Sequence, residues 1–138
     1  MTPEQISKVQ ETWSAVTPIA GKAADLFYDR LFNLEPKLKE LFPEDLTEQK
    51  KKLMSMIARV VSALRDLPSV VPAIQELGRR HVGYGVTKED YAIVGSALLW
   101  TLEQGLGAAW TPEVKDAWVA AYTVLSNTMI AAAAEVAA

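Results

Sequence analysis

Apolar residues recur three and four positions apart along most of the chain, which is the spacing of one face of an α-helix. Val70, Ile74 and Leu77 are one example, and the same spacing returns in each long segment between prolines and glycines. No segment shows the sustained alternation of apolar and polar residues that is typical of a half-buried β-strand. The pattern predicts an all-α protein with six main helices and one short helix.

Several segments carry residues that commonly begin a helix: a capping threonine, a proline in the first turn, or a side chain three residues later that completes a capping box. These segments are Thr2-Pro3-Glu4-Gln5, Thr17-Pro18, Thr87-Lys88-Glu89-Asp90 and Thr111-Pro112-Glu113. Pro36 opens a short helix that ends near Phe42, and the loop after it is too short for a further helix. Either Asp45 or Thr47 can cap the helix that follows. We expect the alanine-rich tail to fray after about Ala134.

Length and charge narrow the classes of protein. The 138 residues are predicted to form one domain spanning 1–138, with helices packed at angles because glycines and prolines fall at their junctions. A net charge of −3 offers no basic field to nucleic acid. No apolar run approaches the roughly 18–20 residues of a membrane span, and no signal peptide is evident, so we expect no membrane span and a cytoplasmic location. The absence of cysteine excludes disulfides, thiolate metal sites and thiol catalysis.

His81 is the only histidine of the chain. It continues the helical spacing of Ile74 and Leu77, and it therefore lies on the apolar face of a helix. Gly83 and Gly85 are expected to end that helix just beyond it. Two interpretations are open: a core-facing histidine whose polar atoms are satisfied by the backbone, or a functional imidazole.

Few kinds of chemistry suit a lone histidine in these surroundings. Nucleophilic catalysis needs an orienting acid, but Arg79 and Arg80 precede the histidine, and no Gly-x-Ser-x-Gly motif occurs. A zinc site needs several protein ligands, and no phosphate-binding loop is present. A single histidine on an apolar helix face does suffice for axial ligation of haem iron, because the cofactor supplies the other ligands. A helical binding module without a cofactor remains the alternative.

A series of short motifs spans nearly the whole chain. They are Leu26-Phe27-Tyr28-Asp29-Arg30-Leu31-Phe32, Pro36, Leu41-Phe42, Gly78-Arg79-Arg80-His81, Tyr91-Ala92-Ile93-Val94-Gly95, Leu98-Leu99-Trp100, Leu106-Gly107, Thr111-Pro112, Ala117-Trp118 and Tyr122. Each motif alone is weak, but in order and spacing the series resembles the globin family, in particular single-domain bacterial haemoglobins and neuroglobins. The resemblance implies a globin fold whose helices pack around a pocket for haem b.

The resemblance also implies a role for individual residues. His81 is expected to be the proximal ligand of the haem iron. Tyr28, Gln49 and Leu53 are expected to line the opposite, distal side of the haem. The expected apolar pocket consists of Phe42, Leu77, Val82, Val86, Tyr91, Val94 and Leu98.

The polar residues among these have ordinary interpretations as well. Lys52 and Arg80 are expected to reach the haem propionates, but each is also compatible with a solvated cation. Gln49, taken alone, is typical of a helix surface. Tyr28 is compatible with a core tyrosine whose hydroxyl has a partner.

Two features depart from common globin patterns. The chain has no second histidine, so one chain cannot coordinate the iron through two histidines, and a five-coordinate iron is expected. Flavohaemoglobin-like globins add a glutamate to the proximal histidine and tyrosine. Here Tyr91 is present, but the glutamate position falls near Ala133 and Glu135 is out of phase. We therefore expect His81 to be a comparatively neutral ligand, which disfavours peroxidase-like activation.

The resemblance implies a protein that binds O2 reversibly, as in oxygen transport or storage, and also binds CO and NO. An alternative is nitric oxide dioxygenation with an external reductase, because 138 residues leave no room for a flavin domain. A third possibility is an interaction module without haem.

Overall fold

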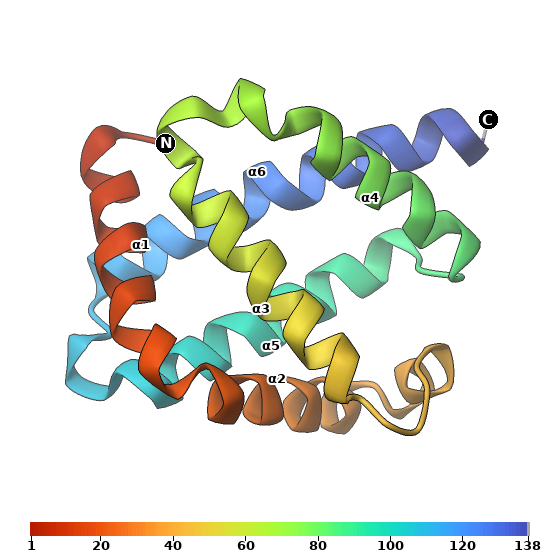
Figure 1. The fold of residues 1–138 in the computed structure, drawn as a ribbon, viewed down its shortest axis with the longest axis horizontal. Coiled ribbons are helices and arrows are strands. Elements are labelled where there is room, and N and C mark those ends of the chain that lie inside the picture. The colour runs from red at the N-terminus through yellow and green to blue at the C-terminus, as the bar shows by residue number, and fades with distance from the viewer. Residues whose placement is uncertain (138) are drawn as a thin grey trace.

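The computed structural model describes residues 1–137, which fold into six α-helices joined by short 3-10 helices and turns, without a strand in this range (Figure 1). The α-helices are α1 (Pro3–Val16), α2 (Ala20–Leu34), α3 (Thr47–Ser62), α4 (Val71–Gly83), α5 (Lys88–Leu106) and α6 (Pro112–Ala137). The 3-10 helices are η1 (Thr17–Ile19), η2 (Pro36–Leu41), η3 (Leu64–Ser69) and η4 (Gly107–Ala109). The predicted all-α fold is confirmed, and η2 is the predicted short helix.

Capping threonines begin three of the helices as predicted. The Thr2 hydroxyl accepts a hydrogen bond from the Gln5 backbone at 3.1 Å, and the Gln5 side chain accepts one from Thr2 N–H at 3.0 Å. Thr87 and Asp90 form the same reciprocal pair at the start of α5. The Thr111 hydroxyl accepts from the first turn of α6. These bonds satisfy backbone donors that a helix start otherwise leaves free.

The starts of α2 and α3 and the end of α6 either differ from the prediction or decide between its alternatives. Thr17 and the proline after it begin η1 rather than α2, which starts at Ala20. Asp45 Oδ1 accepts hydrogen bonds from Thr47 N–H at 3.0 Å and Thr47 Oγ1 at 2.7 Å, so Asp45 satisfies the first amide of α3, although the N-cap position itself is Leu46. The expectation of fraying after Ala134 is wrong, because α6 continues to Ala137. Alanine has the highest helix propensity, which accounts for the longer helix.

Two long packing contacts organise the fold: α4 lies along α6, and α2 lies along α5. The helix α1 also packs on α6, where the Trp13 and Trp118 rings lie 6.1 Å apart. Trp118 Nε1 donates to the Thr12 hydroxyl at 2.9 Å, so its polar atom is satisfied at the edge of the core. In Figure 1, α3 passes in front of α5, and α3 and α4 diverge from each other toward the right of the view.

Two glycines permit the closest helix contacts. A Cβ atom at Gly78 would lie only 2.4 Å from the Met129 carbonyl oxygen, so the α4 backbone rests directly on the α6 backbone. A Cβ atom at Gly95 would lie 2.6 Å from the Tyr122 ring. The contact at Gly78 comes one helical turn before His81 and therefore sets where that histidine stands.

The segment Pro112–Val136 of α6 is long and apolar enough to cross a membrane by length and composition, with a mean hydropathy of 1.3. This corrects the expectation that no apolar segment of the chain is long enough for a membrane span. The same helix buries Val114, Ala117 and Trp118 in the core. Only 28% of the apolar window is buried, so packing in the core accounts for part of its composition, and one such helix is weak evidence of a membrane span.

Candidate functional site

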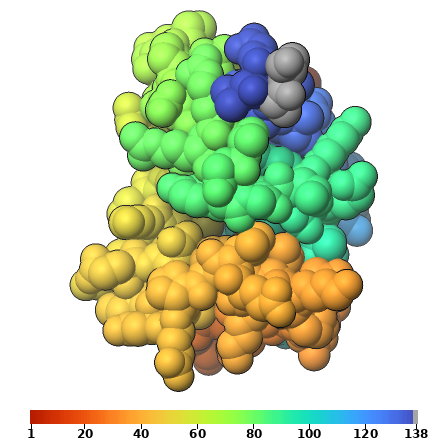
Figure 2. All heavy atoms as spheres, turned by 90° about the vertical axis from the view of Figure 1, so that its right-hand side faces the viewer, coloured from red at the N-terminus to blue at the C-terminus, as the bar shows by residue number. Residues whose placement is uncertain are grey.

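The residues predicted for the distal side and for iron ligation come from α2, α3 and the end of α4. Figure 2 shows one face of the molecule, with η2 below, the first turns of α3 at one side and the turn between α4 and α5 above. His81 lies in the last turn of α4, whereas Gln49 and Leu53 lie in the first two turns of α3. Tyr28 comes from the middle of α2. The predicted site residues thus come from segments that lie far apart in the sequence.

His81 is half-buried, and one of its ring nitrogens is satisfied by its own helix. Its Nδ1 atom lies 2.6 Å from the Leu77 carbonyl oxygen. Because a carbonyl only accepts, we assign the proton to Nδ1, which leaves Nε2 with a free lone pair. Burial lowers the pKa of His81, although the Leu77 carbonyl raises it in part. The neutral ring with a free Nε2 is the form that binds a metal ion.

The two open interpretations of His81 therefore apply to different atoms of one ring. The backbone satisfies Nδ1, as expected of a structural histidine, while Nε2 remains available. The same contact is the usual second interaction of a metal-binding histidine, because it fixes the tautomer and the ring orientation.

Aromatic rings rather than carboxylates surround His81. The Tyr84 ring meets it edge-on at 5.6 Å between centroids, and the Tyr91 ring lies at 6.3 Å. Glu135 instead lies 4.0 Å from Arg79, on the exposed side of α4. Among residues 1–137 no hydrogen-bond partner is found for the buried Tyr91 hydroxyl. His81 thus has only a carbonyl as its proximal acceptor.

Tyr28 is one of the two polar residues predicted for the distal side. It is only 3% exposed, and burial raises the pKa of its hydroxyl, while a hydrogen bond with the Gln49 side chain lowers it in part. The rings of Phe27 and Phe42 meet the Tyr28 ring nearly edge-on, at 5.0 and 5.6 Å. The aromatic contacts hold the ring in place, so the hydroxyl is kept beside Gln49.

An ion pair joins the two helices that carry these donors. Lys50 Nζ of α3 lies 2.8 Å from Asp25 Oδ1 of α2. The pair is adjacent to Gln49 in sequence and one turn from Tyr28. Because both partners are partly exposed, we assign it a modest contribution of at most about 1 kcal/mol to stability.

Most of the apolar residues predicted for the pocket are half-buried, as residues that line a ligand space are. Tyr91 and Leu98 are buried in the core. The half-buried residues are Phe42, Leu53, Leu77, Val82, Val86 and Val94.

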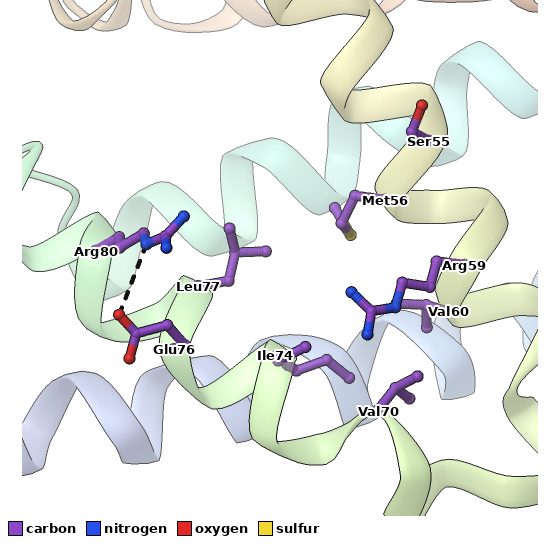
Figure 3. A pocket seen from close by; sticks show the side chains of 10 residues that line it. Ser55, Met56, Arg59, Val60, Val70, Ile74, Glu76, Leu77 and Arg80 are labelled. Atoms are coloured by element: carbon purple, nitrogen blue, oxygen red, sulfur yellow. Dashed lines mark ion pairs between the residues drawn. The ribbon is translucent and has the colours of Figure 1, made fainter.

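A cavity of about 400 Å³ lies between α3 and α4 (Figure 3). Its lining residues are Ser55, Met56, Arg59, Val60, Val70, Ala73, Ile74, Glu76, Leu77 and Arg80. The volume falls in the range of ligand pockets, and the walls are mainly apolar with a few polar groups, as is usual for such sites. Leu77 and Arg80 were predicted to contact a cofactor, and both line this cavity. Lys52 is exposed and is not among its lining residues.

The sequence analysis did not identify Met56 or Arg59 as site residues. A signal was available, since Met56 follows Leu53 by three positions and Arg59 follows Lys52 by seven, which places each pair on one helix face. Periodicity alone does not show that Met56 and Arg59 face the cavity, because it does not tell how far along α3 the cavity extends.

A model of the globin family matches residues 25–129, a range that includes every predicted site residue. The chain belongs to the globin family. Globins hold haem iron through a proximal histidine and bind small gaseous ligands on the haem. The predicted family and fold are therefore confirmed, and haem-based ligand binding is the general activity of the family.

Curated relatives of this globin include haem proteins of different lengths. Neuroglobin of Danio rerio is 30% identical over 135 residues, covering 88% of this chain and 85% of that protein. The flavohemoprotein of Bacillus subtilis is 34% identical over 109 residues, and that of Bordetella parapertussis is 31% identical over 133 residues. These matches cover 75% and 94% of this chain but only 27% and 33% of the flavohemoproteins. This globin therefore spans about a third or less of those two proteins.

A solved structure supports the fold independently. The bacterial globin from Campylobacter jejuni superposes with a TM-score of 0.87 over 99% of both chains, at 24% sequence identity. The likeness shows that the two chains share one fold.

Proposed function

We propose that this globin holds haem b through His81 Nε2 and reversibly binds O2, and also CO and NO, on the Tyr28 side. The observation that carries the proposal is the contact between His81 Nδ1 and the Leu77 carbonyl oxygen, 2.6 Å apart, which leaves Nε2 free to bind iron. The apolar residues around the ring fit a porphyrin, and Leu77, whose carbonyl accepts from His81, also lines the cavity between α3 and α4. When bound, haem would supply an iron atom that His81 holds and that binds a diatomic gas.

The distal residues are suited to stabilise a polar gas ligand. With haem in place, the Tyr28 hydroxyl and the Gln49 amide would be the donors available to a polar gas ligand, and Leu53 would limit the space beside them. In a pocket that excludes water, each donor contributes about 1–3 kcal/mol, which is about 10- to 100-fold in the dissociation rate. With no second histidine in the sequence, this chain would offer the iron one imidazole only.

Absorption spectra of the purified protein test the proposal. We expect a Soret band after expression with sufficient haem, a five-coordinate ferrous spectrum, and distinct spectra with O2 and with CO. A colourless protein that does not take up added haem would refute haem binding and would favour an interaction module.

Replacing Tyr28 by phenylalanine tests the distal donor. The change keeps the ring and its contacts with Phe27 and Phe42 but removes the hydroxyl. We expect O2 to dissociate about tenfold faster, whereas CO dissociation changes less, because bound CO is less polar. Stopped-flow ligand replacement measures both rates. Tyr84→Phe is the control, since its side chain is exposed, and equal small effects on both gases would contradict the role of Tyr28.

The distal side is expected to respond little to pH. An ordinary tyrosine keeps its proton throughout pH 5–8, burial raises the pKa of Tyr28 further, and the Gln49 amide does not titrate. We therefore expect the O2 dissociation rate to change less than about threefold across this range. Gln49→His introduces a group that titrates near pH 6.5, and this variant is expected to gain acid sensitivity. A steep change near pH 6 in the unaltered protein would contradict the prediction.

Similarity to flavohemoproteins favours nitric oxide dioxygenation as a second candidate. The reaction joins NO and O2 and takes up one electron to give nitrate, so repeated turnover requires a reductase. We expect one turnover without a reductase and many after adding a flavin reductase with its reduced nicotinamide. If the reaction stops after one turnover even with several such reductases, the result would favour gas binding without this enzyme activity.

A further inference from the structure

We infer that Arg59, at the mouth of the α3–α4 cavity, binds a propionate carboxylate of the haem together with Arg80. The inference rests on the proposed haem function. It assigns a role to a residue that the sequence analysis did not single out, and it gives Arg59 the place that the sequence analysis assigned to Lys52.

The cavity has the polarity that an amphiphilic ring with an anionic edge requires. Met56 and Leu77 face each other across it from α3 and α4, and Ile74 and Val60 continue the apolar walls (Figure 3). The guanidinium of Arg59 turns toward the cavity from the α3 side. Apolar walls and a cationic rim match a porphyrin whose two carboxylates reach solvent.

The two arginines at the rim differ in how their charge is compensated. Arg80 Nε lies 3.6 Å from Glu76 Oε1, and Glu76 also pairs with Arg79 at 3.3 Å. Among residues 1–137, no ion pair is found for Arg59. Glu76 therefore weakens the attraction of Arg80 for an anion, whereas Arg59 keeps its full charge, and we expect Arg59 to contribute more.

Arginine also has the geometry for this role. Its planar guanidinium donates two parallel hydrogen bonds to one carboxylate. Both arginines are exposed, so solvent screens the attraction, and the expected effect is moderate rather than decisive for haem binding.

The test compares haem with its dimethyl ester, in which both carboxylates are neutral. In Arg59→Met we expect haem to leave about three- to tenfold faster than in the unaltered globin, whereas loss of the dimethyl ester is unchanged. The readout is transfer of the porphyrin to an excess of an acceptor protein, followed by absorbance. Lys51→Met is the matched control, because Lys51 is an exposed cation of the same helix, and it is expected to change neither rate.

In Glu76→Gln we expect haem to be retained longer, which damage to the fold would not produce. Removing this carboxylate frees Arg80 and relieves repulsion of the propionates, so haem loss is expected to slow about twofold or more while loss of the dimethyl ester stays the same. Arg80→Met is expected to have a smaller effect than Arg59→Met. Circular dichroism checks that each variant keeps its helix content.

Different results separate this inference from the proposed function. If the unaltered globin binds neither haem nor the dimethyl ester, the proposed function fails. If it binds haem but Arg59→Met loses haem at the unaltered rate, the inference alone is wrong. Equal acceleration of both porphyrins would also overturn it, because the effect would then come from the shape of the cavity.

Discussion

Replacing His81 by glycine is expected to abolish stable haem binding, with haem loss faster by about 100-fold or more. The chain has no other histidine to take its place, and the backbone contact at Nδ1 shows that the ring is already oriented by Leu77. Because a ligand that binds the folded state stabilises it, the loss of haem also removes about 3–4 kcal/mol or more of unfolding free energy. Transfer of haem to an acceptor protein and denaturant unfolding measure the two effects.

Imidazole added to His81→Gly supplies the control. The small molecule can occupy the space left by the side chain and offer the missing nitrogen, so we expect partial recovery of the spectrum and of haem retention. If His81→Gly kept a normal ferrous spectrum and an unchanged affinity for haem, the assignment of His81 as the ligand would be wrong.

A methyl group at Gly78 is expected to be the most costly change outside the haem contacts. In Gly78→Ala the new Cβ atom would lie 2.4 Å from the Met129 carbonyl oxygen and 2.7 Å from Met129 Cα, which are backbone atoms that cannot rotate away. We expect a loss of about 1–3 kcal/mol in the free energy of unfolding. Since α4 must move away from α6, His81 moves with it, and faster haem loss is expected as well.

Gly83→Ala is the matched control in the same helix. A Cβ atom at Gly83 meets nothing within 4 Å, so we expect a change of less than about 0.5 kcal/mol. Urea unfolding of the haem-free proteins measures both variants. Equal stability of Gly78→Ala and Gly83→Ala would contradict the close contact between α4 and α6.

Local sequence signals predicted the elements well because those signals act within a few residues. The capping boxes at Thr2 and Thr87 bond residues only three positions apart, and both form as expected. The 3-10 helix at Thr17–Ile19 was not predicted, since a threonine followed by a proline begins either kind of helix. The apolar character of α6 was underestimated because its alanines do not form an unbroken run of large apolar residues.

The sequence by itself determined the family, the order of the helices and the presence of one histidine on an apolar helix face. The family follows from the resemblance of the ordered motifs, whereas the helix order and the face of the histidine follow from periodicity and caps, which do not depend on how helices pack. The tertiary structure decided which groups meet: Tyr28 with Gln49, Arg59 with the α3–α4 cavity, and Gly78 with the α6 backbone. Each of these contacts joins residues far apart in the chain, and their distances depend on the packing of whole helices, which no local pattern encodes.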